Sequence, residues 1–306
     1  MPELRSQQEE VAVVSSAEKM RAYYELTKPG IAQMVVLSAA AGYLFAVDHF
    51  LVYFADWRHV LHFLGFLVGV ALVASASGSL NHYVERDVDA VMRRTANRPL
   101  PSGRVTPAKS LGFAIALALV GFFILALINF FVLILAVLTL VSYIAVYTPL
   151  KKRTVWNTYV GAIPGALPPL GGWVAVQNSF DLSGWLLFAL LFLWQIPHFF
   201  SLAWLHREDF KAGNFRMLSV VDPSGKIVGV HTVLTILALI VVSLWLYFAA
   251  DLNLLYVVGS VSLGIYLLWH ALQFWRQPGD QQARKLLIAC YLYLPAILLI
   301  LLLGKW

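Results

Sequence analysis

Charged residues are scarce in this chain, and a soluble domain needs more of them. They make up 12% of the 306 residues, while hydrophobic residues make up 60%. An ordinary soluble domain carries roughly 25% charged residues. A water-soluble core cannot bury that much apolar surface, so the composition excludes a sizeable soluble domain and predicts a membrane protein.

Cysteine is also nearly absent, since Cys290 is the single one. It cannot form an intramolecular disulfide, so cysteine usage does not indicate a redox compartment. The first 24 residues lack an apolar core and contain four glutamates, which argues against a signal peptide or an acid-poor transit peptide. We therefore expect a cytoplasmic N-terminal tail over residues 1–24 and a single transmembrane domain over residues 25–306.

Long apolar runs dominate the rest of the chain. A helix needs about 20 apolar residues to cross a bilayer, whereas barrel strands would appear as alternating segments of about ten residues. Only helices satisfy their own backbone hydrogen bonds in lipid over such lengths. The sequence predicts an all-α, polytopic membrane protein with a bundle of nine transmembrane helices. The expected spans are residues 30–47, 59–80, 110–128, 130–147, 158–176, 183–203, 227–250, 253–273 and 285–303.

Basic residues are distributed unevenly between the two sides of these spans. Of 22 lysines and arginines, 20 lie before the first span or in loops that follow an even-numbered span. This bias marks the cytoplasmic side of a membrane protein, so the net charge of +6 reports orientation and not nucleic-acid binding. We expect a cell (inner) membrane protein with a cytoplasmic N-terminus and an external, periplasmic C-terminus.

Acidic residues cluster in the two longest cytoplasmic loops, one cluster around Asp87 and the other around Asp209. Carboxylates contribute little to orientation, so this clustering needs another explanation. Acids beside arginines and lysines suggest a divalent cation with a polyanionic ligand. A network of solvated salt bridges is the alternative interpretation.

The first acidic cluster has helical spacing. At 100° per residue, Asn81, Glu85 and Asp89 fall within about 80° of one another on a helix. Such oxygen ligands suit Mg²⁺, which commonly takes one or two carboxylates and completes its shell with water and phosphate. Arginines follow at once, and their forked side chains bind phosphate in a bidentate manner. The pattern predicts a diphosphate site, although some of these arginines also mark the cytoplasmic face or meet anionic lipid headgroups.

The segment from Asn81 to Leu100 resembles the first Asp-rich motif of the UbiA superfamily of intramembrane prenyltransferases. The superfamily pattern is N-D-x-x-D-x-x-x-D, and this chain has His82 and Glu85 at the second and third named positions. The departure at His82 is typical of the haem-directed branch. So is the run that continues through Arg86, Asp87, Asp89, Met92, Arg94, Thr95, Arg98, Pro99 and Leu100.

A second polar cluster follows the sixth expected span. His198 and Asp209 are eleven residues apart, close to three helical turns, so a continuous helix would align them with His198 deeper. Pro197 would kink that helix. The segments around Trp194–His198 and Asp209–Gly213 resemble the second motif of the haem-directed branch. This resemblance implies that Asp209 is a metal ligand and that His198 faces the acceptor as a haem ligand or proton-transfer group. A satisfied interhelical hydrogen bond is the alternative role for His198.

The resemblance extends over residues 26 to about 225 and implies a reaction. A farnesyl group would pass from farnesyl diphosphate to a vinyl group of protohaem IX (haem B), giving haem O, with Mg²⁺ as the cofactor. It implies catalytic roles for Asn81, Glu85, Asp89, His198 and Asp209, all but His198 as metal ligands. The expected substrate-binding residues are Lys28, Arg86, Arg93, Arg94, Arg98, Lys151, Lys152, Arg153, Trp194, Gln195 and Lys211. The expected partners are the two substrates and the lipid bilayer, with haem–copper oxidase assembly proteins as further candidates.

Two other functions stay open. A UbiA-type enzyme that acts on a quinone precursor or another aromatic acceptor would share the diphosphate site. A secondary transporter would carry ionisable groups or broken helices near the middle of the membrane. Nearly all charged residues lie outside the expected spans, which disfavours ion-coupled transport.

Overall fold

The computed structural model describes residues 15–305, so most of the expected tail, residues 1–14, lies outside the described residues. The described chain contains helices and no strand, which confirms the all-α prediction. The helices are α1 Ser16–Leu26, α2 Pro29–Ala46, α3 Phe50–Tyr53, α4 Trp57–Asp89, α5 Pro107–Ile128, α6 Phe130–Val141, the π-helix η1 Ser142–Tyr147, α7 Thr148–Leu150, α8 Asn157–Gln177, α9 Leu182–Leu205, α10 Arg207–Ala212, α11 Leu218–Val221, α12 Lys226–Ala249, α13 Leu254–Arg276 and α14 Asp280–Lys305.

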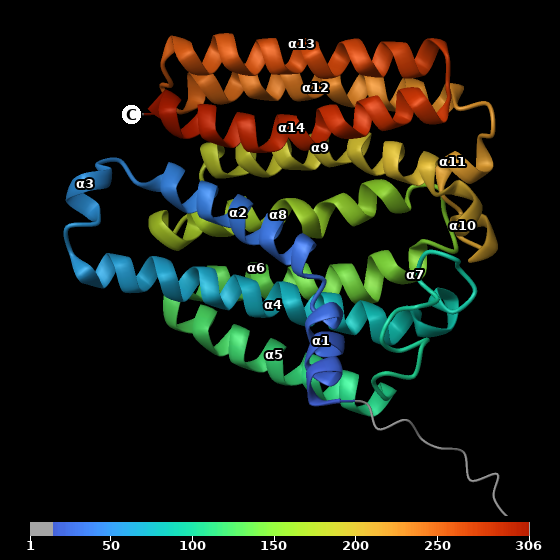
Figure 1. Cartoon of the computed structure of the whole chain (residues 1–306). Coiled ribbons are helices and arrows are strands. Elements are labelled where there is room, and N and C mark those ends of the chain that lie inside the picture. The colour runs from blue at the N-terminus through green and yellow to red at the C-terminus, as the bar shows by residue number, and fades with distance from the viewer. Residues whose placement is uncertain (1–14, 306) are drawn as a thin grey trace, which may run out of the picture.

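Eight helical segments within residues 15–305 are long and apolar enough to cross a bilayer. One of them is the continuous run of α6, η1 and α7. The remaining expected span corresponds to α8, which has 21 residues but includes three prolines. This helix packs against α2, α6 and α9 in the middle of the bundle (Figure 1). The fold is thus close to the expected nine-helix bundle, with α8 as an internal member.

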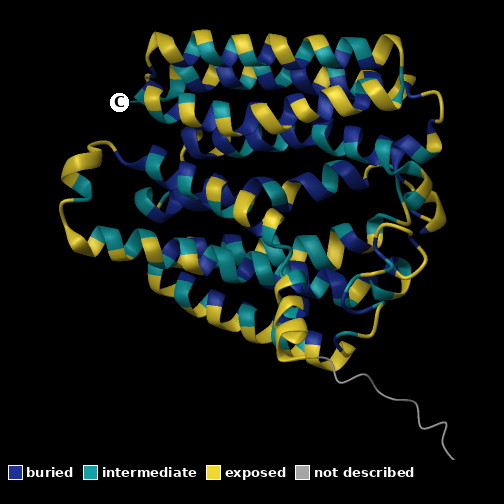
Figure 2. Ribbon diagram, in the orientation of Figure 1, coloured by how far each residue is buried: buried dark blue, intermediate teal, exposed yellow. Residues whose placement is uncertain are grey.

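The burial pattern fits a protein surrounded by lipid. Outer helices alternate buried residues with exposed ones, as Figure 2 shows for α5 and α13. Many exposed residues there are large and apolar, such as Leu119 in α5 and Trp269 in α13. The chain is therefore a multi-pass membrane protein whose apolar exterior contacts lipid chains.

Helix α4 carries the first acidic cluster out of the membrane. Its 33 residues span about 50 Å, whereas the hydrocarbon layer is about 30 Å thick, so part of the helix projects beyond that layer. The loop after α4, helix α7 and helix α10 lie at the same end of the bundle, while α3 and the C-terminus lie at the other end (Figure 1). The polar motifs therefore gather at one end, as the charge distribution indicated; which side of the membrane this is stays a prediction.

Helix α1 occupies part of the segment that we assigned to the tail. Ser15 and Glu18 form a capping box at its start. Its buried residues Ala22 and Leu26 pack against Leu100 and Val105 in the loop after α4. Arg104 in the same loop bonds Glu25 at 2.6 Å. This helix is thus attached to the loop that carries the arginines, and the domain division at residue 24 stays a prediction.

A sharp corner joins α1 to α2. Lys28 forms it with a φ of 49°, a left-handed conformation that is unusual for a residue with a side chain. The corner lies directly on α4, because a Cβ atom added at Gly78 would sit 3.0 Å from the carbonyl oxygen of Thr27. Glycine at this position lets the two backbones approach closely and places Lys28 beside the end of α4.

The prolines do not interrupt their helices. Helix α8 runs unbroken through Pro164, Pro168 and Pro169. Helix α9 also continues through Pro197, whose own carbonyl oxygen accepts a hydrogen bond from the Ser201 hydroxyl at 2.7 Å.

The expected continuous helix from His198 to Asp209 is wrong. Helix α9 ends at Leu205, and His206 has φ −112° and ψ 22°, outside the helical region. Helix α10 then starts at Arg207, whose guanidinium bonds Asp280 at 2.7 Å. The three-turn alignment of His198 with Asp209 therefore does not hold, and the two residues lie on separate helices.

Candidate active site

The first acidic cluster lies on one continuous helix, as its spacing predicted. Helix α4 runs through Asn81, Glu85 and Asp89 and ends at Asp89. All three side chains are buried, and that of Asp89 is fully inaccessible. The Asn81 amide donates to Glu85 Oε2 at 2.9 Å, so the first two residues form one hydrogen-bonded pair. We call these three residues the α4 stripe.

Three cations from separate parts of the chain bind the α4 stripe. Lys28, at the α1–α2 corner, donates to Asn81 Oδ1. Lys151, just after α7, donates to Glu85 Oε1 at 2.7 Å. The Arg98 guanidinium lies 2.8 Å from both oxygens of Asp89. These charge-assisted bonds hold buried carboxylates that would otherwise be costly to desolvate.

Further bonds fix the geometry around these pairs. The Thr95 hydroxyl donates to the backbone oxygen of Asp89 at 2.9 Å and so holds the turn that returns Arg98 to α4. The Lys151 ammonium lies 4.7 Å from the centre of the Tyr147 ring. That ring packs on Gly161, where an added Cβ would come within 2.4 Å of it. The role of Tyr147 was missed from the sequence, because a π-helix such as η1 has no readable periodicity.

Electrostatic effects connect α10 to the same site. Desolvation and repulsion from Arg98 lower the pKa of Lys28 to about 7. Desolvation and repulsion from Arg98 also lower the pKa of Arg94, whereas Asp209 opposes that shift. Asp209 therefore lies near the arginine loop. Among residues 15–305 its carboxylate has no hydrogen bond or ion pair, which leaves it available to a ligand.

Several of the other predicted basic residues lie around this site without joining it. Arg86 donates to the backbone oxygen of Tyr83 at 2.8 Å and covers its ring. The side chains of Arg93, Lys152, Arg153 and Lys211 are exposed on the surrounding loops and helices. The structure thus brings together Lys28, Arg98 and Lys151. Arg94 is also exposed but interacts electrostatically with Asp209, Asp89 and Glu85, and the remaining residues lie at the periphery.

The predicted residues of α9 are held among helices and are not in contact with the α4 stripe. Trp194 donates from its indole nitrogen to the backbone oxygen of Cys290 at 3.0 Å. Gln195 donates to backbone oxygens of Leu191 and Ala162. The His198 ring stacks on Trp194 and meets the edge of Tyr291, and its Nδ1 has no hydrogen-bond partner within the described chain. The interhelical hydrogen bond that was the alternative for His198 is thus absent at Nδ1.

One buried histidine was not selected from the sequence. His82 is 3% exposed, and its Nδ1 has no partner among residues 15–305. It precedes Glu85 by three residues and Asp89 by seven, a spacing that also places residues on one helical face. The i, i+3, i+7 spacing of His82, Glu85 and Asp89 could have identified His82 as a site residue from the sequence alone. In the sequence, His82 was noted only as a departure from the superfamily pattern.

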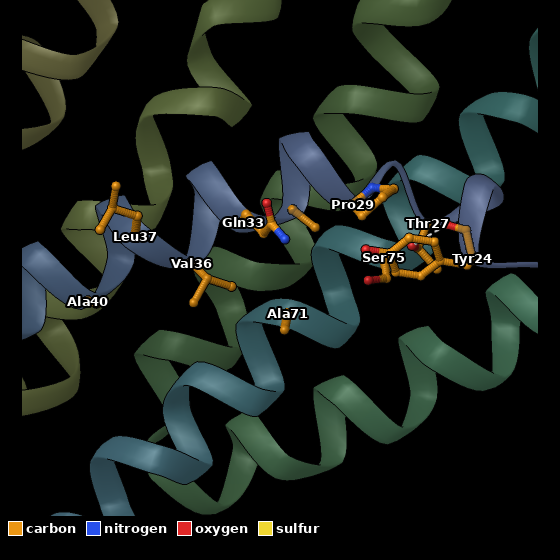
Figure 3. A pocket seen from close by; sticks show the side chains of 10 residues that line it. Tyr24, Thr27, Pro29, Gln33, Val36, Leu37, Ala40, Ala71 and Ser75 are labelled. Atoms are coloured by element: carbon orange, nitrogen blue, oxygen red, sulfur yellow. Dashed lines mark hydrogen bonds between the residues drawn. The ribbon is translucent and has the colours of Figure 1, made fainter. Parts of the chain in front are cut away.

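Two cavities lie near these elements. A groove of about 510 Å³ runs between α2 and α4 and is largely apolar; Figure 3 shows its lining residues, which include Tyr24, Thr27, Gln33, Leu37, Ala71 and Ser75. The α1–α2 corner lines this groove through Thr27 and Pro29, and its Lys28 binds Asn81 of the α4 stripe. A second cavity of about 110 Å³ lies among η1, α8, α9, α10 and the residues before α11, lined in part by Tyr147 and Phe210.

The donor atoms fit Mg²⁺ bound together with a phosphate ligand. No group of three or more histidine, cysteine, aspartate or glutamate side chains within residues 15–305 could hold a metal ion by itself. Mg²⁺ does not require such a cage, since it often binds one or two carboxylates with substrate phosphates and water. Glu85 and Asp89 supply two carboxylates, and the surrounding cations match the phosphate oxygens.

Comparison with known proteins identifies the family. The UbiA prenyltransferase family matches residues 35–299. The chain belongs to this family. A relative from Solibacter usitatus, named protoheme IX farnesyltransferase, is 40% identical over 94% of this chain and 99% of its own length. This UbiA family member is thus a prenyltransferase by sequence.

Solved structures agree with the UbiA fold. A digeranylgeranylglyceryl phosphate synthase superposes with a TM-score of 0.76 at 18% identity, covering 94% of this chain and 99% of that one. A UbiA homologue from Archaeoglobus fulgidus, bound to DMAPP and Mg²⁺, gives a TM-score of 0.62 at 15% identity over 91% of this chain and 98% of that one. At these identities the likeness shows the fold alone.

Proposed function

We propose that this UbiA family member transfers a farnesyl group from farnesyl diphosphate to a vinyl group of haem B, giving haem O. The observation that carries the reaction class is the α4 stripe, which meets cations from three other segments at one end of the bundle. A diphosphate needs such cations, and its metal needs such carboxylates. The choice of haem as acceptor rests on the relative from Solibacter usitatus.

The charges of the site suit a ligand whose negative charge exceeds the positive charge of the metal bound with it. Arg94, Arg98 and Lys151 supply three positive charges, and Lys28 supplies a fourth when it is protonated. Glu85, Asp89 and Asp209 supply three negative charges. When the diphosphate binds, Lys151 and Arg98 exchange their carboxylate partners for phosphate oxygens. That exchange frees carboxylate oxygens of Glu85 and Asp89 for the metal.

The metal ligands in this proposal are Asn81, Glu85 and Asp89, with Asp209 contributing from α10. Mg²⁺, when bound, would draw negative charge from the phosphate oxygens as the diphosphate leaves. The protein cations do the same once they bind the phosphate oxygens. The structures of UbiA homologues with Mg²⁺ and a prenyl diphosphate support this choice of cofactor.

The chemistry requires no protein nucleophile. The allylic C–O bond breaks, and its electron pair leaves with the diphosphate. The π electrons of the haem vinyl group then form the new C–C bond to the allylic cation. Water adds to the resulting cation and loses a proton, which gives a hydroxyethylfarnesyl substituent. The apolar bundle keeps water from the allylic cation before the vinyl group reacts.

The acceptor is proposed to bind beside α9. His198 lies there among aromatic rings, with Nδ1 unbonded among the described residues. Trp194 and Gln195 support it by fixing α9 to α14 and α8. The site end of the bundle is proposed to face the cytoplasm of a cell (inner) membrane, with the C-terminus on the external side. Haem–copper oxidase assembly proteins are proposed partners on the family resemblance alone.

The direct test uses the purified chain with haem B, farnesyl diphosphate and Mg²⁺, followed by mass spectrometry of the extracted pigments. We expect a haem product that is heavier by one farnesyl group and one hydroxyl group. If the enzyme leaves haem unmodified but farnesylates an aromatic quinone precursor, the quinone-directed alternative replaces this proposal.

A further inference from the structure

The His82 ring belongs to the face of α4 that carries the acids. At 100° per residue, His82 lies about 60° from Glu85 and about 20° from Asp89 around the helix. The helix is continuous from Trp57 to Asp89, so these angles apply to the folded chain. His82 is therefore closer in direction to Asp89 than Asn81 is.

His82 differs from its neighbours on this face in its hydrogen bonding. Asn81, Glu85 and Asp89 all have side-chain partners. His82 is almost fully buried, yet its Nδ1 has no partner in the described chain. An unsatisfied buried polar group is costly, so in a folded protein it calls for an explanation such as a catalytic role or a bound ion or water.

The charges around the ring indicate the kind of ligand. Lys28 and Arg98 both act electrostatically on His82. They also bind Asn81 and Asp89, so the ring lies beside the cations that the diphosphate would use. An imidazole ring has at least one N–H donor in each of its protonation states.

We propose that His82 binds the diphosphate of the prenyl donor through a hydrogen bond from its ring N–H. This inference rests on the proposed function and adds a hydrogen-bond donor to the cations of the site. Mg²⁺ prefers oxygen ligands, whereas imidazole suits transition metals, so the ring is assigned to the phosphate and not to the metal. A hydrogen bond to the leaving group also strengthens as negative charge develops on it.

The test measures binding of a non-reacting donor analogue, farnesyl S-thiolodiphosphate, to the full-length chain with Mg²⁺ by calorimetry. His82→Leu should weaken binding roughly ten- to a hundredfold, since a hydrogen bond to a charged group contributes about 1.5–3 kcal/mol. His82→Gln, which keeps an N–H donor, should recover most of that affinity. His270 on α13 also has an unpartnered Nδ1 and provides the control: His270→Leu should bind the analogue as the unchanged chain does.

Haem binding, followed by absorption spectroscopy, should be unaltered in His82→Leu. Unchanged analogue affinity in this variant overturns the proposal, as does an equal loss in His82→Gln. Loss of haem binding alone assigns the ring to the acceptor instead. A further measurement uses Mn²⁺ in place of Mg²⁺, bound together with the analogue. If its electron spin-echo spectrum shows coupling to a nitrogen nucleus, and this coupling is lost in His82→Gln, the ring is assigned to the metal.

A measurement on the unchanged sequence covers the case in which His82→Leu does not fold. In protein labelled with ¹⁵N-histidine, the His82 ring resonance, assigned through His82→Gln, should shift when the analogue binds. No shift overturns the proposal. If the analogue results hold while no farnesylated haem forms from the true substrates, the proposed reaction fails and the role of His82 stands.

Discussion

Arg98 lies 2.8 Å from both carboxylate oxygens of Asp89, which is the last residue of α4 and fully buried. The pair satisfies the acid and fixes the arginine beside the end of the helix. Removing the carboxylate while keeping its shape would therefore affect the proposed metal site and the position of the arginine together.

We expect Asp89→Asn to lower farnesylated haem production at least about a hundredfold, the usual scale for a group that stabilises transition-state charge. Asp87→Asn is the control, because Asp87 is only two residues away but exposed. The measurement is product formation across a Mg²⁺ titration. Normal turnover in Asp89→Asn, or turnover without any divalent cation, would remove the acids of α4 from the mechanism.

Lys151→Met should lower both stability and donor affinity. Glu85 is 6% exposed, and its Oε1 would lose the ammonium that balances its charge. Breaking one partner of a buried pair commonly costs about 3–5 kcal/mol. Lys152→Met is the matched control, since the neighbouring Lys152 is exposed. Thermal unfolding and calorimetry with the donor analogue measure the two effects, and equal behaviour of the two variants would contradict the assignment.

His198→Ala should separate the two substrates. Because His198 lies on α9, away from the α4 stripe, we expect unchanged affinity for the diphosphate and a loss of haem binding or product. Imidazole is a common haem ligand, so an altered haem absorption spectrum in the variant would support iron ligation. Normal haem spectra and normal turnover would leave His198 as a packing residue.

Gly78→Val should displace the α1–α2 corner. The new side chain would meet the backbone of Leu26 and Thr27, which cannot move without shifting Lys28. We expect a loss of about 1–3 kcal/mol in stability together with weaker donor binding. Gly112→Ala in α5 is the control: nothing lies within 4 Å of the added carbon, so that variant should be neutral or stabilised. Weaker donor binding in both variants would show that the corner has no special role.

The orientation predicts which positions an impermeant thiol reagent reaches in intact cells. Leu51→Cys, on the exposed surface of α3, should react, and Asn97→Cys, in the arginine loop, should react only after the membrane is opened. The native Cys290 is fully buried and should give little background. If Asn97→Cys reacts in intact cells and Leu51→Cys does not, the topology is the opposite of the predicted one.

The sequence predicted those parts of the site that depend on one helix. The positions of Asn81, Glu85 and Asp89 follow from helical spacing, because α4 continues unbroken to Asp89. The partners of these residues could not be predicted in the same way. Lys151 reaches Glu85 across 66 residues of chain, and only tertiary packing brings the two together.

The error at His198 and Asp209 arises because no local signal marks the end of the helix. Neither glycine nor proline lies between Leu205 and Asp209 to signal a helix end. The break at His206 accompanies long-range bonds, since Arg207 binds Asp280 in α14 and Trp204 donates to the same carboxylate. Periodicity alone cannot reveal such a competition between a local helix and a distant partner.

The length of α4 also divides the site into a rigid half and a movable half. Its acids share one long helix that is anchored in the membrane, whereas Lys28, Arg98 and Lys151 come from a corner and two loops. Loops exchange their amide hydrogens faster than buried helices do. Donor binding should therefore slow hydrogen exchange in residues 90–106 and 151–156 and leave α4 nearly unchanged. In this enzyme the substrate would be enclosed by mobile cations that close onto a fixed row of acids.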